Sequence, residues 1–136
     1  MIARQPDVPN LIRVLTEKAY YELMTDKVIV FVTCETREQA EQIAEAVVTE
    51  KLAACVNILP GVRSCYRWDG KVTFSEEVLC LMKSTRGRFD QLQDRIKALH
   101  SYSVPEIAAV TIEDVFRGYA EWIDESIGGE KWKERK

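Results

Sequence analysis

The chain has 136 residues, 46% of them hydrophobic, which is enough for one domain with an ordinary core that needs no metal or disulfide support. Its 19 basic and 22 acidic residues are mixed along the sequence and leave a net charge of -3, so there is no basic stripe of the kind that binds nucleic acid. The longest fully apolar run has five residues, whereas a membrane-spanning helix needs about 20. We therefore predict one domain that binds neither nucleic acid nor membranes.

The beginning of the chain and its cysteines indicate a cytoplasmic protein. The first ten residues contain two prolines and an aspartate, where a secretory signal needs an apolar segment. The four cysteines form no C-x-x-C pair and have no histidine at zinc-ligand spacing. We expect them to be reduced thiols that pack as small apolar side chains.

The first half of the chain reads as an extension followed by strand, helix and strand. Residues 1–26 form the extension, and apolar residues at helical spacing predict a helix over 9–24, which Asn10 can cap. A strand is predicted over 28–34. Thr36 and Gln39 then have the spacing of a capping box for a helix that continues to Leu52. The next strand, 53–59, is predicted to end where Pro60-Gly61 interrupts the pattern.

A long hairpin is predicted in the middle of the chain, because Asp69-Gly70 is a strong two-residue turn signal. A two-residue loop sets three cross-strand pairs, namely Trp68 with Lys71, Tyr66 with Thr73, and Arg63 with Glu76. The arm 71–83 is much longer than the usual strand of about 5 to 6 residues. It must bend sharply or reach beyond its own subunit.

The second half repeats the plan of the first. A helix is predicted over 88–99, a strand over 107–112 and a short helix over 119–127, before a charged tail at 129–136. We predict one domain over 27–128. Segments 28–58 and 78–112 are both strand, helix and strand, and two such units interleave into an α+β, ferredoxin-like βαββαβ sandwich with both helices on one face.

The strands at 28–32 and 78–82 are apolar at every position, whereas a half-exposed strand alternates apolar and polar residues. Both faces of the sheet must therefore be covered. The additional N-terminal and C-terminal helices can do part of this. The overlong hairpin suggests that subunits pack sheet against sheet, and we predict a homo-oligomer.

Three motifs in order resemble the CutA, or divalent-cation tolerance, family. They are the run Glu50 to Asn57 (EKLAACVN) within 28–59, the turn Tyr66 to Lys71 (YRWDGK), and the stretch His100 to Ile107 (HSYSVPEI), followed by a similar closing helix. The resemblance covers about 100 residues and leaves the first 26 or so unmatched. It implies a homotrimer of ferredoxin-like subunits whose hairpins cross to neighbours. It also implies a non-enzymatic role in tolerance to divalent metal ions, with copper bound by some members.

The resemblance transfers only part of a metal site. In copper-binding relatives the ligands are a cysteine near the end of the first strand and two adjacent histidines. Here Val32 and Leu99 take the places of the cysteine and the first histidine, and His100 alone is retained. Cys34 lies two residues from Val32 on the same strand face. The metal candidates are thus His100 and Cys34, and the other interpretation of His100 is a hydrogen-bonding group at a helix end.

Other candidates lie at strand ends and on the hairpin. Lys83, Glu106 and Tyr102 are candidates for a ligand cleft between subunits, although Lys83 and Glu106 could equally form a structural ion pair. The expected interface residues are aromatic, namely Tyr66, Trp68 and Trp122. No phosphate loop or nucleophile elbow is present, so we expect no catalysis. The alternatives are a small-molecule or nucleotide sensor, like the nitrogen-regulatory signalling proteins that the fold resembles, and a ligand-free scaffolding trimer.

Overall fold

A computed structural model describes residues 26–128 of the chain. The elements in chain order are β1 (Lys27–Cys34), α2 (Arg37–Thr49), β2 (Cys55–Trp68), β3 (Lys71–Thr85), the short 3-10 helix η1 (Arg86–Arg88), α3 (Phe89–Leu99), β4 (Ile107–Thr111) and α4 (Arg117–Ser126). Within these residues no helix is long and apolar enough to cross a membrane. The predicted helix 9–24 and the charged tail 129–136 lie outside the described residues, and the domain boundaries 27–128 stay a prediction.

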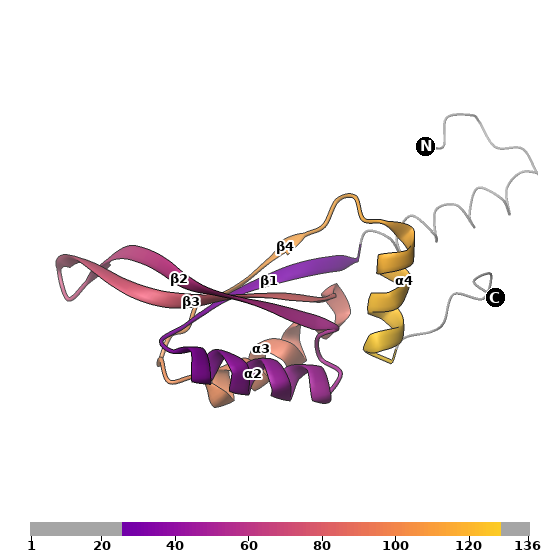
Figure 1. Cartoon of the computed structure of the whole chain (residues 1–136), viewed down its shortest axis with the longest axis horizontal. Coiled ribbons are helices and arrows are strands. Elements are labelled where there is room, and N and C mark those ends of the chain that lie inside the picture. The colour runs from indigo at the N-terminus through magenta and orange to yellow at the C-terminus, as the bar shows by residue number, and fades with distance from the viewer. Residues whose placement is uncertain (1–25, 129–136) are drawn as a thin grey trace, which may run out of the picture.

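The four strands form one antiparallel sheet in the order β2-β3-β1-β4, so β1 lies between β3 and β4. The two halves β1-α2-β2 and β3-α3-β4 interleave, and α2 and α3 cover the same face of the sheet (Figure 1). The hairpin of β2 and β3 projects from one end of the sheet, and α4 lies at the other end (Figure 1). The predicted α+β, ferredoxin-like βαββαβ sandwich with a long hairpin and a C-terminal helix is confirmed.

The hairpin has the register that its turn predicts. The three cross-strand pairs are Trp68 with Lys71, Tyr66 with Thr73, and Arg63 with Glu76. Asp69 and Gly70 have φ angles of 53° and 76°, the positive values that a two-residue type I′ turn requires at both central positions. A local rule at the turn therefore determines the pairing of the whole projecting arm.

Pro60-Gly61 does not end the second strand, so that prediction is wrong; the two residues form a bulge inside β2. The pairing with β3 shifts between Leu59 and Val62 and then continues to the hairpin tip. Gly61 has φ of 80°, which glycine adopts at little cost, and Pro60 lacks an N–H group, which an edge strand tolerates. The bulge lets one strand run from the sheet into the hairpin.

The core lies between the sheet and helices α2 and α3. Alternate residues of the two central strands point into it and are buried, namely Val28, Val30, Val32 and Cys34 on β1 and Val78, Cys80 and Met82 on β3. The helices contribute Ala40, Ile43, Val47, Leu92 and Ile96, all fully buried. The apolar stripes of the two predicted helices are therefore the helix faces that pack against the sheet.

The other face of the sheet is also apolar. Residues that pair across antiparallel strands share a face, which assigns to this side Ile29, Phe31, Leu59, Leu79, Leu81, Ala108 and Val110, together with Thr33, Cys55, Asn57 and Lys83. We call these residues the open face. Among the described elements only α4 reaches it, at one end, through Tyr119 beside Cys55. Val110 is 48% exposed and Leu59 is 40% exposed. Residues 26–128 of one subunit thus leave part of this apolar surface uncovered.

The start of α2 is tied to the end of α3. The Thr36 hydroxyl caps α2 and accepts a hydrogen bond from the backbone N–H of Gln39 at 3.1 Å. The Gln39 side chain does not return to Thr36, as a capping box requires, so this half of the prediction is wrong. Instead its amide donates to the Leu99 carbonyl at 3.3 Å and its oxygen accepts from the Ser101 hydroxyl at 2.8 Å. These bonds hold the segment that begins at His100.

A buried ion pair holds α4 against β1. The Lys27 side chain is fully buried, and its ammonium lies 2.6 Å from the Asp26 carboxylate and 3.1 Å from that of Asp124 on α4. Just after the C-terminal end of α4, the Arg88 guanidinium donates to the Ile127 carbonyl at 2.7 Å. Four apolar or aromatic residues complete the contact, namely Ala54, Tyr119, Ile123 and Ile127.

Replacing Asp124 with asparagine removes a carboxylate that lies 3.1 Å from the buried Lys27 ammonium. We expect Asp124→Asn to lower the free energy of unfolding by about 3 kcal/mol, measured by urea unfolding with circular dichroism. The matched control is Glu50→Gln, which breaks the pair of Glu50 with Arg95, whose side chains are 41% and 38% exposed. It should cost about 1 kcal/mol or less. Equal losses in the two variants would contradict this role of Asp124.

Candidate functional site

His100 is the residue that follows α3, and it is almost fully buried near the root of the hairpin. Its Nδ1 atom accepts a hydrogen bond from the backbone N–H of Tyr102 at 3.0 Å. The proton therefore sits on Nε2, which donates to the Thr33 carbonyl at 2.7 Å. Both ring nitrogens are used inside the subunit. A metal ion can bind His100 only after one of these bonds is broken.

Tyr102 and Glu106, two of the predicted cleft residues, lie beside His100. The Tyr102 hydroxyl donates to the Glu77 carboxylate at 2.8 Å, and the Thr33 hydroxyl donates to Glu106 at 3.4 Å. Burial, and then the bond to Glu77, raises the pKa of Tyr102 and keeps its phenol protonated. Sequence reasoning misses Glu77, because the pairing of β3 with β1, which ends at Cys34 and Val78, brings it there. We call Thr33, Glu77, His100, Tyr102 and Glu106 the hairpin-root cluster.

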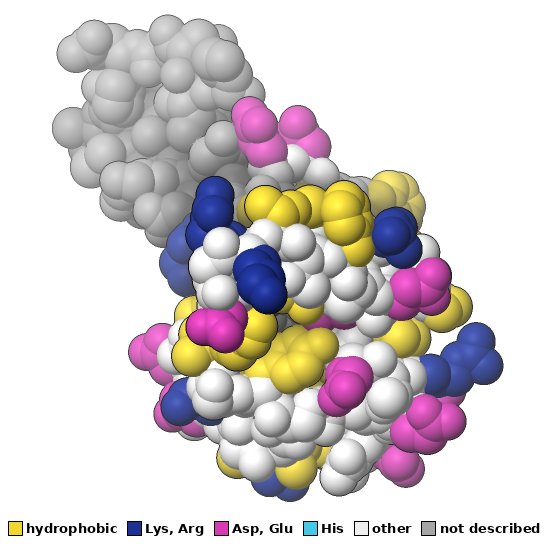
Figure 2. Space-filling view, turned by 90° about the vertical axis from the view of Figure 1, so that its left-hand side faces the viewer, with side chains coloured by type: hydrophobic (Ala, Val, Ile, Leu, Met, Phe, Trp, Pro, Cys, Tyr) yellow, Lys and Arg dark blue, Asp and Glu magenta, His cyan; other side chains and the backbone are white. Residues whose placement is uncertain are grey.

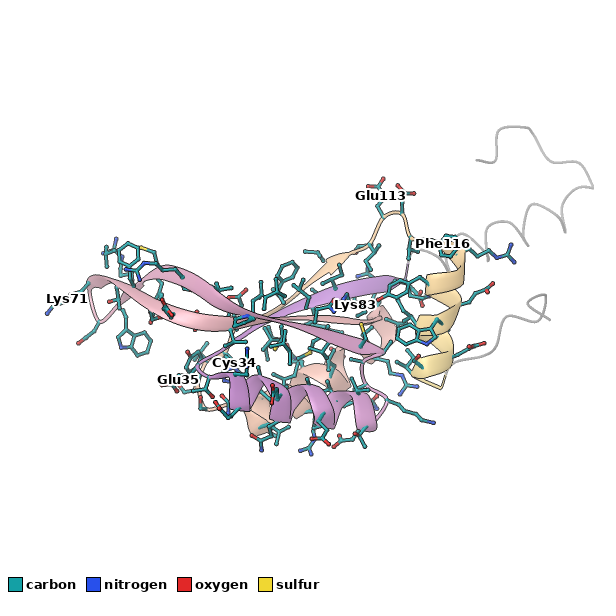
Figure 3. All side chains as sticks on the ribbon, in the orientation of Figure 1. Cys34, Glu35, Lys71, Lys83, Glu113 and Phe116 are labelled. Atoms are coloured by element: carbon teal, nitrogen blue, oxygen red, sulfur yellow. The ribbon has the colours of Figure 1, made fainter. Side chains whose placement is uncertain are left out.

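Cys34 lies at the same end of the sheet, where Figure 3 shows it next to Glu35, but its side chain points into the core. A hydrogen bond with the Cys80 thiol, and then burial, raise the pKa of Cys34. Within residues 26–128 no three or more His, Cys, Asp or Glu side chains are grouped so that they could hold a metal ion. The structure brings both metal candidates to one end of the sheet without joining them in a ligand set.

Lys83 lies toward the other end of the open face, near α4 (Figure 3). Glu106 is bonded to Thr33, which is four residues along β1 from the position opposite Lys83, or about 13 Å. The two cleft candidates are therefore not brought together within one subunit. The Lys83 ammonium instead contacts the side-chain oxygen of Asn57 and lies 3.7 Å from the Cys55 sulfur.

The hairpin carries exposed apolar side chains, which Figure 2 shows between charged groups on the end of the molecule that faces the viewer. Tyr66 and Trp68 share one side of the hairpin and are 41% and 68% exposed. Trp122, the third interface candidate, is on α4 and stacks on Tyr119 with 5.6 Å between ring centroids. Exposed aromatic side chains on a projecting hairpin are typical of a protein contact.

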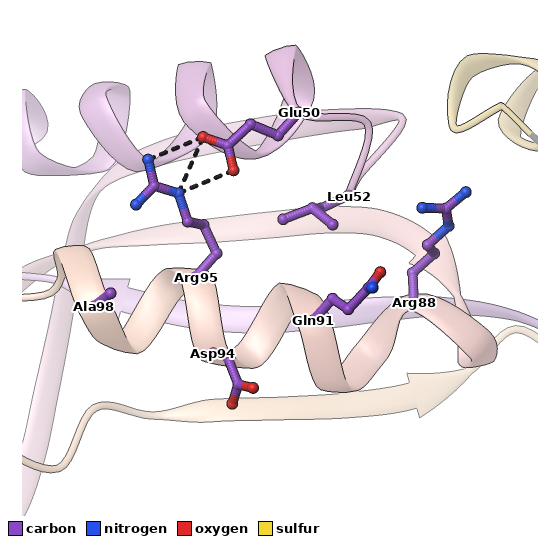
Figure 4. A pocket seen from close by; sticks show the side chains of 7 residues that line it. All are labelled: Glu50, Leu52, Arg88, Gln91, Asp94, Arg95 and Ala98. Atoms are coloured by element: carbon purple, nitrogen blue, oxygen red, sulfur yellow. Dashed lines mark hydrogen bonds and ion pairs between the residues drawn. The ribbon is translucent and has the colours of Figure 1, made fainter.

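A surface groove between α2 and α3 is lined by Glu50, Leu52, Arg88, Gln91, Asp94, Arg95 and Ala98 (Figure 4). Arg95 spans it and donates from Nε to the Glu50 carboxylate at 2.9 Å. The other arginine, Arg88, is bonded to the Ile127 carbonyl. Because both guanidinium groups are engaged in contacts between elements, we assign the groove a structural role.

Comparison with known proteins identifies the family that has this arrangement. Residues 28–126 match the family described as CutA1 divalent ion tolerance protein. The chain belongs to this family. It is 48% identical to the divalent-cation tolerance protein CutA of Thermus thermophilus over 100 residues, which are 74% of this chain and 97% of that protein. It is 40% identical to the chloroplastic CutA of Arabidopsis thaliana over 73% of this chain and 54% of that longer protein.

Solved CutA structures have the same fold. The T. thermophilus protein superimposes with a TM-score of 0.73 at 47% identity, over 75% of this chain and 99% of that chain. CutA1 of Oryza sativa gives 0.74 at 38% identity, over 76% and 95%. The protein described as periplasmic CutA of Archaeoglobus fulgidus gives 0.72 at 37% identity, over 74% and 98%. The resemblance to CutA predicted from the three motifs is confirmed.

The thiol of Cys34 should be unreactive in the folded protein, because its raised pKa leaves little thiolate near pH 8 and its side chain is buried. We expect iodoacetamide to modify Cys34 and Cys80 far more slowly in the native protein than in guanidinium chloride, as measured by mass spectrometry of peptides. The exposed Cys65 is the internal control for the reagent. Labelling of native Cys34 at its unfolded rate would contradict this placement.

Proposed function

We propose that this protein is a cytoplasmic homotrimer that takes part in tolerance to divalent metal ions and catalyses no reaction. The relatives that it matches are named for divalent-cation tolerance, which supports the role. The open face supports the assembly, because it presents a largely apolar surface that the described residues of one subunit cover only in part. All four cysteines are free, which supports a reducing compartment.

The open face is the observation that carries the assembly. Ile29, Phe31 and Leu81 lie near its centre and are only partly buried in one subunit. Covering apolar surface stabilises a contact by about 25 cal/mol per Å², so a face of this kind favours association. A hairpin that projects past the sheet can contact a neighbouring subunit, and a closed ring in which each hairpin reaches the next subunit leaves no hairpin unused.

We place the metal ion between subunits rather than within one. His100 uses both ring nitrogens and Cys34 is buried in the core, so neither presents a ligand atom in the single subunit. Glu77 and Glu106 each accept one hydrogen bond in the hairpin-root cluster and have oxygen lone pairs left over. A subunit packed on the open face can add its own metal ligands there. A set of oxygen and imidazole ligands suits copper(II) or another divalent ion.

The assembly is tested by placing a charge on the open face. Light scattering of the unaltered protein should give three times the 15.6 kDa of one chain. Leu81→Asp buries an unpaired carboxylate at the subunit contact and should give the mass of one chain, with the far-UV circular dichroism of a folded protein. Val48→Asp, on the exposed side of α2, is the matched control and should remain trimeric. A single-chain mass for the unaltered protein would overturn the trimer.

Metal binding is tested by calorimetric titration of the trimer with copper and zinc. We expect Glu77→Gln to weaken binding at least as much as His100→Ala, because Glu77 presents free lone pairs whereas His100 must first give up a bond. Glu45→Gln, on α2 away from the hairpin root, is the matched control and should leave binding unchanged. No heat from either metal at micromolar trimer would contradict direct metal binding.

A further inference from the structure

Lys83 and Lys27 are the charged strand residues at the α4 end of the open face, and Lys27 is paired with the carboxylates of Asp26 and Asp124. The neighbours of Lys83 across the strands are Ile29 on β1 and Cys55 on β2, and the adjacent positions along β3 on this face are Leu81 and the end of the strand. The Lys83 side chain is half-buried. An ammonium group in such a place is costly unless something compensates its charge.

The groups of residues 26–128 that the Lys83 ammonium contacts are neutral. It donates to the Asn57 side-chain oxygen and lies 3.7 Å from the Cys55 sulfur. No carboxylate of the described residues forms an ion pair with it. Because the Asn57 oxygen accepts from Lys83, the amide NH₂ of Asn57 is turned the other way and is available as a donor.

Two aromatic side chains of α4, Tyr119 and Trp122, lie on the Cys55 side of this group of residues. The Tyr119 hydroxyl lies 3.6 Å from the Cys55 sulfur, and the Tyr119 ring stacks on Trp122 with an angle of 19° between the planes. Burial, followed by the contact with Cys55, raises the pKa of Tyr119 to about 12. Its phenol therefore stays protonated and can donate a hydrogen bond at neutral pH.

We propose that Lys83, Asn57 and Tyr119 bind a small oxyanion, a carboxylate or phosphate group, at the α4 end of the open face. The ammonium supplies the charge, and the Asn57 amide and Tyr119 hydroxyl supply neutral donors. Lysine is a point charge with three donors, which suits both kinds of oxyanion. A divalent cation is repelled here, so this site is distinct from the metal site proposed at the hairpin root.

The proposed assembly strengthens the case for a bound anion. A subunit packed over the open face removes water from Lys83, and an ammonium buried without a counter-charge costs several kcal/mol. The bound oxyanion provides that counter-charge. The alternative source, a carboxylate of the neighbouring subunit, gives a different experimental result, because Lys83 would then have no capacity for an added anion.

The test compares Lys83→Met with Lys71→Met in the full chain. Both remove one positive charge, but Lys71 is exposed at the hairpin tip. Inorganic phosphate and malonate are titrated separately at constant ionic strength, with the thermal midpoint and calorimetric heat as readouts. We expect saturable binding of at least one anion to the unaltered protein and to Lys71→Met. Binding to Lys83→Met should be weaker by about tenfold or more.

The two anions separate the possible ligands, because saturation by phosphate alone indicates a phosphate group and saturation by malonate alone indicates a carboxylate. No saturable effect of either anion, or equal binding to both lysine variants, would overturn the proposal. If Lys83→Met does not fold, Tyr119→Phe replaces it and should weaken binding severalfold while the trimer mass is retained. Unchanged affinity in Tyr119→Phe would then overturn it. Light scattering and the copper titration report separately on the proposed function.

Discussion

Strand β1 has to bury both of its faces, and the arrangement of the molecule follows from this. Val28, Val30 and Val32 point toward α2 and α3, whereas Ile29 and Phe31 lie on the open face. Each buried methylene contributes about 0.8 kcal/mol, so neither row is stable in water. A duplicated βαβ unit places both of its helices on one side of the sheet, and the other side is left for another protein surface.

The two ends of the open face carry groups of opposite charge. At the hairpin root, the carboxylates of Glu77 and Glu106 accept hydrogen bonds from Tyr102 and Thr33, the two residues that also bond to His100. At the α4 end, the contacts that the Lys83 ammonium makes within the described residues are with the neutral side chains of Asn57 and Cys55. The first end attracts cations and the second attracts oxyanions. Because both lie on the surface that we propose as the subunit contact, a ligand bound at either end would stabilise the assembly.

Local rules in the sequence were sufficient for most of the helices and strands within residues 26–128 and for the hairpin register, which the Asp69-Gly70 turn sets by itself. They were insufficient where distant segments meet. Pro60-Gly61 reads as a strand end but becomes a bulge, because β3 continues beside it. Gln39 reads as part of a capping box but bonds to the end of α3. His100 reads as a metal ligand by family resemblance, and only the fold reveals that both of its nitrogens are bonded.

Covering of the open face should stabilise the folded subunit, since the central strands carry apolar side chains on both surfaces. Thermal unfolding at protein concentrations over about a hundredfold range tests this most directly. The midpoint temperature should rise with concentration, because unfolding is then coupled to dissociation of the trimer. A midpoint that does not change with concentration, together with the mass of a single chain, would contradict it.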